Sequence, residues 1–311
     1  EAGLPDGVIN VVYGDGPEIG DVALSHPDLA AVHFTGSTGT FQHIWRTVGQ
    51  NVAIYRNYPR LIGETGGKDF ILAHPSADLE ALAVACVRGS FEFQGQKCSA
   101  SSRLYAPRSM WPRLRERIIE ITESLVVGDP TKPDTYVGAV INEKQFRKHE
   151  VALAQARSEG IVVVGGNTDD SVGWFVDPTV LEVSDPQSSF IREELFAPVL
   201  TTYVYGDAEW EKTLSLVDTS TAYGLTGAVF AQDAHAIAMA DDALRYTAGN
   251  FYVNDKPTGS VVGQQPFGGA RASGTNDKAG TVWNMIRFAS PRATKRNHLA
   301  VRDYRYPHHQ A

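Results

Sequence analysis

The sequence predicts an α/β fold with a largely parallel β-sheet. Short runs rich in β-branched residues alternate along the chain with longer amphipathic stretches. The breaks between these segments carry Gly, Pro or Asp, which is typical of loops that join strands to helices. Regular alternation of this kind favours parallel strands covered by helices.

The first 48 residues predict a βαβ-like crossover followed by a helix. The expected elements are a strand at Val8–Tyr13, a helix at Glu18–Ser25, a strand at Ala30–Phe34 and a helix at Thr38–Val48. Two such units do not complete a nucleotide-binding fold.

The same alternation continues to residue 253. The further strands that we expect are Phe70–Ala73, Arg103–Ala106, Ile161–Val164, Thr201–Tyr205, Thr226–Phe230 and Asn250–Val253. The further helices that we expect are Leu79–Phe91, Trp111–Leu125, Glu143–Ser158, Ala208–Val217 and Ala234–Leu244. Residues 258–280 are rich in Gly and Ser and predict loops that shape a site.

Composition excludes several classes of protein. The chain has 311 residues, of which 42% are hydrophobic and 21% charged, enough for one large or two modest globular domains. The formal charge of −8 and the lack of a Lys and Arg cluster argue against a nucleic-acid partner. No run approaches the roughly 18 apolar residues of a membrane span, and the first residues do not resemble a signal peptide.

Only two cysteines occur, Cys86 and Cys98, and in so long a chain they indicate free thiols in a reducing compartment. Cys86 falls on the apolar face of a predicted helix and is expected in the core. Cys98 lies in the segment GQKCSA at residues 95–100, and Glu64 stands 34 residues before it in a second glycine-rich segment. Lys97 and nearby backbone amides are expected to lower the pKa of the Cys98 thiol. Thiol and carboxylate together suit covalent chemistry on a carbonyl.

Three glycine-rich segments are candidates for binding phosphate or shaping a pocket. Residues 14–20 lie between a predicted strand and helix, where Gly16 could contact a dinucleotide and Pro17 could equally begin a helix. Gly36 and Ser37 also precede a helix, so their amides and hydroxyl could face a pyrophosphate, or Ser37 could simply cap that helix. Residues 266–274 predict a loop that faces substrate.

Five motifs in order resemble those of the aldehyde dehydrogenase superfamily. They are FTGS at 34–37, GETGGK at 63–68, GQKC at 95–98, EELFAP at 193–198 and PFGG at 266–269. The segments QKCSA at 96–100 and NFYVNDK at 250–256, with GS at 259–260, are most similar to the branch that oxidises glutamate γ-semialdehyde, the 1-pyrroline-5-carboxylate dehydrogenases of proline breakdown. The resemblance covers nearly the whole chain, but only the C-terminal part of those longer enzymes.

The resemblance implies a partial Rossmann-type nucleotide domain and an α/β catalytic domain. In this family pattern Cys98 is the nucleophile that forms a thiohemiacetal and then a thioester, and Glu64 is the general base for water. A buried inert thiol and a structural salt bridge are the respective alternatives.

Cofactor and substrate contacts carry over by the same resemblance. NAD would meet Gly16 and Pro17 near the adenine, Gly36 and Ser37 at the pyrophosphate, Thr65 and Gly66 at the nicotinamide, and Glu194 and Phe196 at its ribose. NADP remains open, as does an ion pair of Glu194 with Arg192. The charged end of the amino-acid semialdehyde would be held by Ser99, Gly259 and Ser260, with Phe267 on its aliphatic stem, unless the two serines serve ordinary turns.

Three regions follow from this pattern: residues 1–64 as the remnant of the NAD-binding domain, 65–270 as the catalytic domain and 271–311 as a return segment and oligomerisation tail. We expect a homo-oligomer, in the bacterial cytoplasm or the mitochondrial matrix. The start without Met indicates a fragment, and the missing N-terminal half would supply further cofactor contacts and an oxyanion-binding Asn. Losing one such donor costs a factor of about 10² to 10³ in rate, so the isolated chain is expected to be inactive.

Three other readings remain open at this point. A cysteine hydrolase would need a His near Cys98 in space, and none lies near it in sequence. A dehydrogenase for another aldehyde, or a non-catalytic assembly fragment, would share the same motifs. No metal site is expected, because the only close His pair, His308 and His309, lies in a polar tail.

Overall fold

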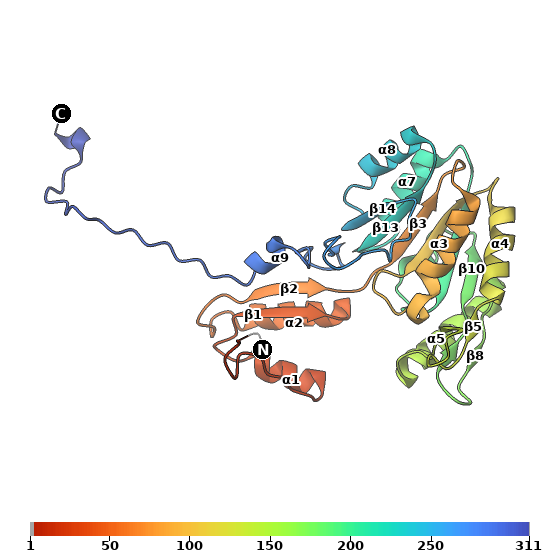
Figure 1. The fold of residues 1–311 in the computed structure, drawn as a ribbon, viewed down its shortest axis with the longest axis horizontal. Coiled ribbons are helices and arrows are strands. Elements are labelled where there is room, and N and C mark those ends of the chain that lie inside the picture. The colour runs from red at the N-terminus through yellow and green to blue at the C-terminus, as the bar shows by residue number, and fades with distance from the viewer. Residues whose placement is uncertain (1–2, 311) are drawn as a thin grey trace.

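The computed structural model describes residues 3–310 and has an α/β fold whose main sheet is mostly parallel, as predicted (Figure 1). The strands of the two parallel sheets are β1 (Ala31–Thr35), β2 (Arg60–Glu64), β3 (Asp69–Ala73), β4 (Ser101–Pro107), β7 (Val162–Val164), β10 (Thr179–Val183), β11 (Val199–Tyr205), β13 (Thr226–Phe230) and β14 (Asn250–Val253). The short paired strands are β5 (Val126–Val127), β6 (Thr135–Val137), β8 (Thr168–Asp169), β9 (Phe175–Val176), β12 (Tyr223–Gly224) and β15 (Ala270–Arg271).

Helices cover these sheets and connect their strands. The α-helices are α1 (Gly16–Leu24), α2 (Thr38–Gln50), α3 (Leu79–Phe91), α4 (Trp111–Glu123), α5 (Glu143–Ser158), α6 (Ser189–Arg192), α7 (Trp210–Thr219), α8 (Ala234–Ala243) and α9 (Val282–Ile286). Two short 3₁₀ helices are η1 (Glu92–Gly95) and η2 (Pro307–His309). Among the described helices, none is both long and apolar enough to cross a membrane.

The large sheet has seven strands in the order β14-β13-β3-β4-β11-β10-β7, and only the β10–β7 pair is antiparallel. Side chains of β3 alternate between its two faces, as the period of a strand requires. Ile71 packs in the cluster formed with α3 and α4, whereas Phe70 and Leu72 pack in the cluster formed with α7 and α8. Helices therefore lie on both faces of the sheet (Figure 1).

A small second sheet precedes the large one. Strands β1 and β2 are parallel, and α2 connects them, so the crossover in this region is β1-α2-β2. Its own small core contains Leu24, Phe41, Ile44, Val48 and Leu61. From β2 the chain runs directly into β3 (Figure 1).

The predicted strand at Val8–Tyr13 was wrong. These residues form no strand, and the large side chains there are exposed, with Tyr13 93% exposed. A β-branched run becomes a strand only where a neighbour pairs with its backbone, and no described strand lies beside this one. Of the strands in the two main sheets, β2 and β10 were missed, because their short sequences show no clear alternation of apolar and polar residues; the short paired strands were missed as well.

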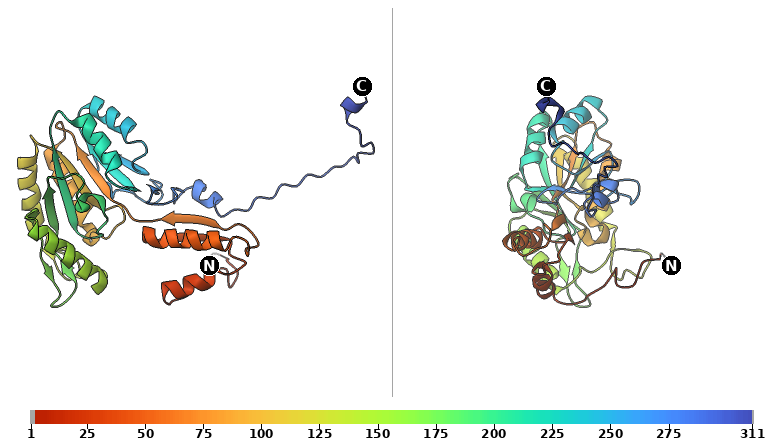
Figure 2. Two further views of the ribbon diagram at one scale, coloured as in Figure 1. Left: turned by 180° about the vertical axis from the view of Figure 1, so that it is seen from behind. Right: turned by 90° about the vertical axis from the view of Figure 1, so that its left-hand side faces the viewer.

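The C-terminal residues lie apart from the rest. Beyond α9 the described chain is mostly extended and leads away from both sheets, as the left view of Figure 2 shows from behind. Where the chain leaves the small sheet, the guanidinium of Arg60 donates hydrogen bonds to the carbonyls of Arg287 and Ala289. The division into regions 1–64, 65–270 and 271–311 stays a prediction.

Candidate active site

The link between the two sheets brings Glu64 to the loop that carries Cys98, residues 95–99, which we call the thiol loop. Glu64 is the last residue of β2, and Thr65 to Lys68 lead from it into β3. A Cβ placed on Gly67 would lie 2.1 Å from the carbonyl oxygen of Cys98. Only a glycine allows this approach of two backbones, so the GG of the motif GETGGK has a steric reason.

The thiol loop needs an unusual backbone. Phe93, Gln94 and Gly95 all have positive φ, of 55°, 58° and 62°. A Cβ on Gly95 would lie 2.2 Å from the carbonyl oxygen of Ala197. This tight left-handed turn carries the chain from α3 to Cys98 and packs it against the segment that follows Glu194.

One cavity of about 640 Å³ gathers most of the predicted residues. Its lining includes the predicted residues Gly36, Ser37, Glu64, Thr65, Gly66, Cys98, Ser99, Glu194 and Phe196. Thr35, Gln96, Lys97, Gln145 and Lys148 complete the lining. The predicted nucleophile, base and several predicted cofactor contacts thus share one space.

Glu64 has the environment of a proton acceptor near neutral pH. Its residue is only 9% exposed, and burial raises the pKa of its carboxyl from 4.5 to about 7, although the Gly269 amide and Lys278 oppose that rise. The amide of Gly269 donates to Oε2 at 3.3 Å. Within residues 3–310 Glu64 forms no ion pair, so the structural salt bridge weighed above is absent.

Cys98 is not activated by Lys97, contrary to our prediction. Burial, followed by the charges of Asp69, Glu64 and Glu194, raises the pKa of the thiol to about 12. The ammonium of Lys97 instead pairs with Glu92 at 3.0 Å. Sequence adjacency to Cys98 therefore does not bring the positive charge to the sulfur.

Glu194 lies across the link between the sheets. The amide of Gly67 donates to its Oε1 at 2.9 Å, and a Cβ on Gly66 would lie 2.3 Å from its Oε2. Among the described residues no donor reaches Oε2, and no ion pair joins Glu194 to Arg192. The alternative of an ion pair with Arg192 is therefore not found, and among the described residues Oε2 has no donor.

Helix α5 holds the backbone around Glu194, which the sequence did not reveal. Lys148 donates to the carbonyls of Glu194 and Leu195, both at 3.1 Å. Nε2 of the buried His149 lies 3.1 Å from the carbonyl of Leu195, which makes that nitrogen the donor. Burial lowers the pKa of His149 to about 4, so the ring is neutral. Phe196 follows with a positive φ of 60°.

Other predicted residues lie outside this cavity. Gly16 and Pro17 line a separate, mostly apolar cavity of about 830 Å³ between α1 and α2. Gly259, Ser260 and Phe267 do not line either cavity, and the Ser260 hydroxyl donates to the carbonyl of Gln265 at 3.2 Å. Only Ser99 of the predicted substrate anchor faces the cavity with Cys98.

Two predicted cofactor contacts, Ser37 at the pyrophosphate and Pro17 near the adenine, stand at helix starts, as the alternatives proposed. Ser37 is the N-cap of α2, and its Oγ accepts from the amide of Thr40 at 3.1 Å. Pro17 stands in the first turn of α1, behind Asp15 as N-cap. The segment 266–274 lies against Glu64 through the amide of Gly269.

In the part of the chain that the structure describes, no group of three His, Cys, Asp or Glu side chains could hold a metal ion.

The motifs and their geometry agree with a comparison against known families. The model of the aldehyde dehydrogenase family matches residues 1–293. The chain belongs to the aldehyde dehydrogenase family. The cavity of about 640 Å³ contains residues of two of the family-like motifs, Glu64 of GETGGK and Cys98 of GQKC.

The matches with three named relatives cover nearly all of this chain but only a little over half of each relative. The mitochondrial delta-1-pyrroline-5-carboxylate dehydrogenase of Bos taurus is 50% identical over 313 residues, which is 100% of this chain and 56% of that relative. A delta-pyrroline-5-carboxylate dehydrogenase of Mycobacterium tuberculosis bound with NAD is 50% identical with a TM-score of 0.91, over 99% of this chain and 56% of the other. A Thermus 1-pyrroline-5-carboxylate dehydrogenase with bound NAD is 35% identical with a TM-score of 0.85, over 92% and 54%.

Proposed function

We propose that this chain forms the catalytic part of an NAD-dependent dehydrogenase that oxidises L-glutamate γ-semialdehyde to glutamate. The observation that carries the proposal is the shared cavity of Cys98, Glu64 and Glu194, on a chain 50% identical to a delta-1-pyrroline-5-carboxylate dehydrogenase. Because the chain spans about half the length of that relative, the activity requires the remaining N-terminal portion.

The two catalytic side chains divide the reaction between them. Sγ of Cys98, once deprotonated, attacks the aldehyde carbon and forms a thiohemiacetal; loss of hydride from that carbon gives a thioester. Glu64 then takes one proton from water while the water oxygen bonds to the thioester carbon. The carbon–sulfur bond breaks, glutamate leaves, and the Cys98 thiolate is restored.

The cavity suits a nicotinamide dinucleotide. NAD, when bound, supplies the oxidant that accepts the hydride. The unpaired Oε2 of Glu194 would accept a ribose hydroxyl hydrogen, and the glycine at position 66 keeps the space beside that oxygen open. The amide of Gly36 donates to the carbonyl of Glu64, so the amides that would face phosphate oxygens are those after Ser37, in the first turn of α2. Adenine would lie in the apolar cavity beside Gly16 and Pro17.

Substrate choice is assigned to Ser99 and to the loop that contains Gly259 and Ser260. Ser99 lies beside the nucleophile, and hydroxyl and amide donors suit the α-carboxylate of an amino-acid aldehyde. Phe267 would pack on the aliphatic stem. The loop must approach Ser99 for this anchor to form.

The proposal also includes a homo-oligomeric assembly and a reducing cellular compartment. The extended C-terminal segment exposes Leu299, Val301 and Tyr304, which suits contact with another subunit in a homo-oligomer. Two free cysteines fit a reducing compartment, either bacterial cytoplasm or mitochondrial matrix.

The test uses a complemented enzyme, defined here as this chain preceded by the N-terminal portion of the bovine relative. Reduced nicotinamide is followed by absorbance with glutamate semialdehyde and with propionaldehyde. We expect turnover with a preference for glutamate semialdehyde, and no turnover from the chain alone. Turnover of neither aldehyde would overturn the dehydrogenase proposal.

Two serine variants of the complemented enzyme, one of them a control, test whether Ser260 contributes to substrate choice. Ser260→Ala is expected to reduce the preference for glutamate semialdehyde about tenfold, since it removes a hydrogen bond to a charged group. Ser158→Ala, at an exposed position of α5, is the matched control and should leave the preference unchanged. If Ser260→Ala keeps the full preference, Ser260 is not part of the anchor.

A further inference from the structure

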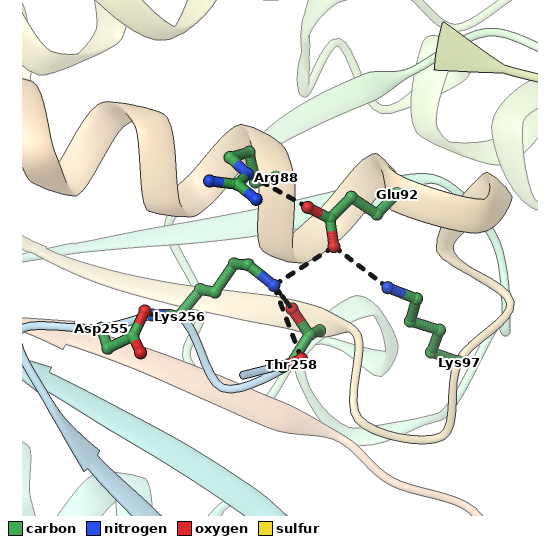
Figure 3. Close-up of polar contacts among 6 residues, drawn as sticks. All are labelled: Arg88, Glu92, Lys97, Asp255, Lys256 and Thr258. Atoms are coloured by element: carbon green, nitrogen blue, oxygen red, sulfur yellow. Dashed lines mark hydrogen bonds and ion pairs between the residues drawn. The ribbon is translucent and has the colours of Figure 1, made fainter. Parts of the chain in front are cut away.

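A cluster of polar side chains beside the cavity, which shares only Lys97 with the cavity lining, connects the thiol loop to a distant segment. Figure 3 shows its members, which are Arg88, Glu92, Lys97, Asp255, Lys256 and Thr258. Glu92, the residue at which α3 ends and η1 begins, lies at the centre. Lys256 comes from a segment 164 residues away in sequence.

Glu92 uses both oxygens in three ion pairs. Its Oε2 accepts from Nζ of Lys97 at 3.0 Å and from Nζ of Lys256 at 3.2 Å. Its Oε1 accepts from Nε of Arg88, one helical turn earlier, at 3.1 Å. One carboxylate oxygen thus holds two ammonium groups from different parts of the chain.

These pairs are shielded from water to different degrees. The side chains of Lys256, Glu92 and Lys97 are 15%, 21% and 33% exposed, whereas that of Arg88 is 56% exposed. Partial burial strengthens an ion pair relative to one on the open surface. Without the carboxylate, the two lysine ammonium groups would repel each other, so Glu92 offsets a repulsion between their two segments.

Each lysine is close to a residue of the proposed reaction. Lys97 directly precedes Cys98 and Ser99. Nζ of Lys256 also donates to Oγ1 of Thr258 at 2.7 Å, directly before Gly259 and Ser260. The left-handed residues Phe93 and Gln94 follow Glu92, so the turn that leads to the thiol begins at the carboxylate that binds both lysines.

We propose that Glu92 is a positioning residue that holds the substrate loop at residues 256–260 against the thiol loop at residues 95–99. It thereby sets the preference for an aldehyde with a charged group at its far end. This inference rests on the proposed function, because the preference has meaning only for that reaction. Glu92 itself does not touch the cavity and acts through Lys97 and Lys256.

The first measurement is the ratio of kcat/KM for glutamate semialdehyde to that for propionaldehyde in the complemented enzyme. Glu92→Gln and Lys256→Met are expected to lower this ratio at least tenfold. Lys256→Arg keeps the charge and should recover most of it. Arg88→Ala is the matched control, because it removes an exposed partner of the same carboxylate, and should change the ratio less than twofold. A ratio that Glu92→Gln leaves unchanged overturns the inference.

The second measurement is amide hydrogen exchange, which needs no activity. Glu92→Gln is expected to speed exchange in both loops, residues 95–99 and 256–260, while Arg88→Ala changes neither. Faster exchange in only one loop overturns the coupling. If the unsubstituted enzyme oxidises neither aldehyde, the proposed function fails, yet the exchange data still decide whether Glu92 couples the loops.

Discussion

The thiol of Cys98 lies among carboxylates, and these control its reactivity at the scale of single residues. Thiolate is the reactive form, and a nearby negative charge disfavours it. Glu194→Gln removes one such charge and should lower the pKa of Cys98, so alkylation by iodoacetamide at pH 8.5 becomes about threefold faster or more. Mass spectrometry of the modified peptide measures the rate.

Two internal controls make that measurement specific. Glu193→Gln removes an exposed carboxylate next in sequence and should not change the alkylation rate. Cys86 is fully buried in the core and should remain unmodified in every variant. Equal rates in the two Glu variants would contradict the electrostatic explanation.

The carboxyl of Glu64 is expected to support turnover but to lower the stability of the fold at high pH. Its pKa is about 7 in the folded protein and about 4.5 when free, so the folded state holds the proton more tightly. The stability that this proton provides is present below pH 4.5 and is lost as pH rises through 7. Glu64→Gln should therefore abolish turnover yet raise stability by about 2 kcal/mol at pH 8.5, and by little at pH 4.5.

Thermal unfolding of both proteins across that pH range measures the difference. A variant that is no more stable than the unsubstituted protein at pH 8.5 would argue that the carboxyl is not desolvated. Turnover of the unsubstituted complemented enzyme should rise between pH 6 and 8 as Glu64 becomes a base.

At the scale of elements, the turn before Cys98 depends on one glycine. Gly95→Ala would place a methyl 2.2 Å from the backbone oxygen of Ala197, at a positive φ. We expect a loss of about 2 to 4 kcal/mol, because the two backbones must separate. Gly49→Ala, in α2 with open space at its Cβ, is the matched control and should stabilise by up to about 1 kcal/mol. Similar losses in both variants would contradict this steric argument.

Most elements of the fold could be predicted from periodicity, and the failures have identifiable causes. The bounds of α3, α5, β13 and β14 agree with prediction because each has a clear period and a polar or glycine boundary. The run at Val8–Tyr13 failed because strand formation depends on a partner that no local pattern reports. Strand β10 was missed for the converse reason: its neighbours β7 and β11 stabilise an ordinary sequence.

The parts of the candidate site that could be predicted are those where the backbone geometry requires a particular residue type. Gly67 and Gly95 had to be glycines, so their motifs were visible. Lys148 and His149 act through carbonyl groups of a loop 46 residues away, and Lys97 turns from the sulfur toward Glu92. Such side-chain directions depend on tertiary packing, which spacing along the chain does not encode.

At the scale of the whole molecule, the small sheet is the part whose surroundings are incomplete. No residue of β1 is fully buried, whereas every residue of β13 is. Apolar side chains also line the cavity between α1 and α2, and the run from Val8 to Tyr13 is exposed. Parallel sheets normally have both faces covered and their interior strands paired on both sides.

The part of the relatives that this chain does not cover should therefore pair with and cover this sheet. Amides of residues 31–35 are expected to exchange at least tenfold more slowly in the complemented enzyme than in the chain alone, because β1 would gain a second neighbour or a covering layer. Amides of β13 are the control, since their hydrogen bonds already lie between β3 and β14 and should exchange equally in both proteins. Equal exchange of β1 in the two proteins would place the N-terminal portion elsewhere and leave the small sheet complete as it stands.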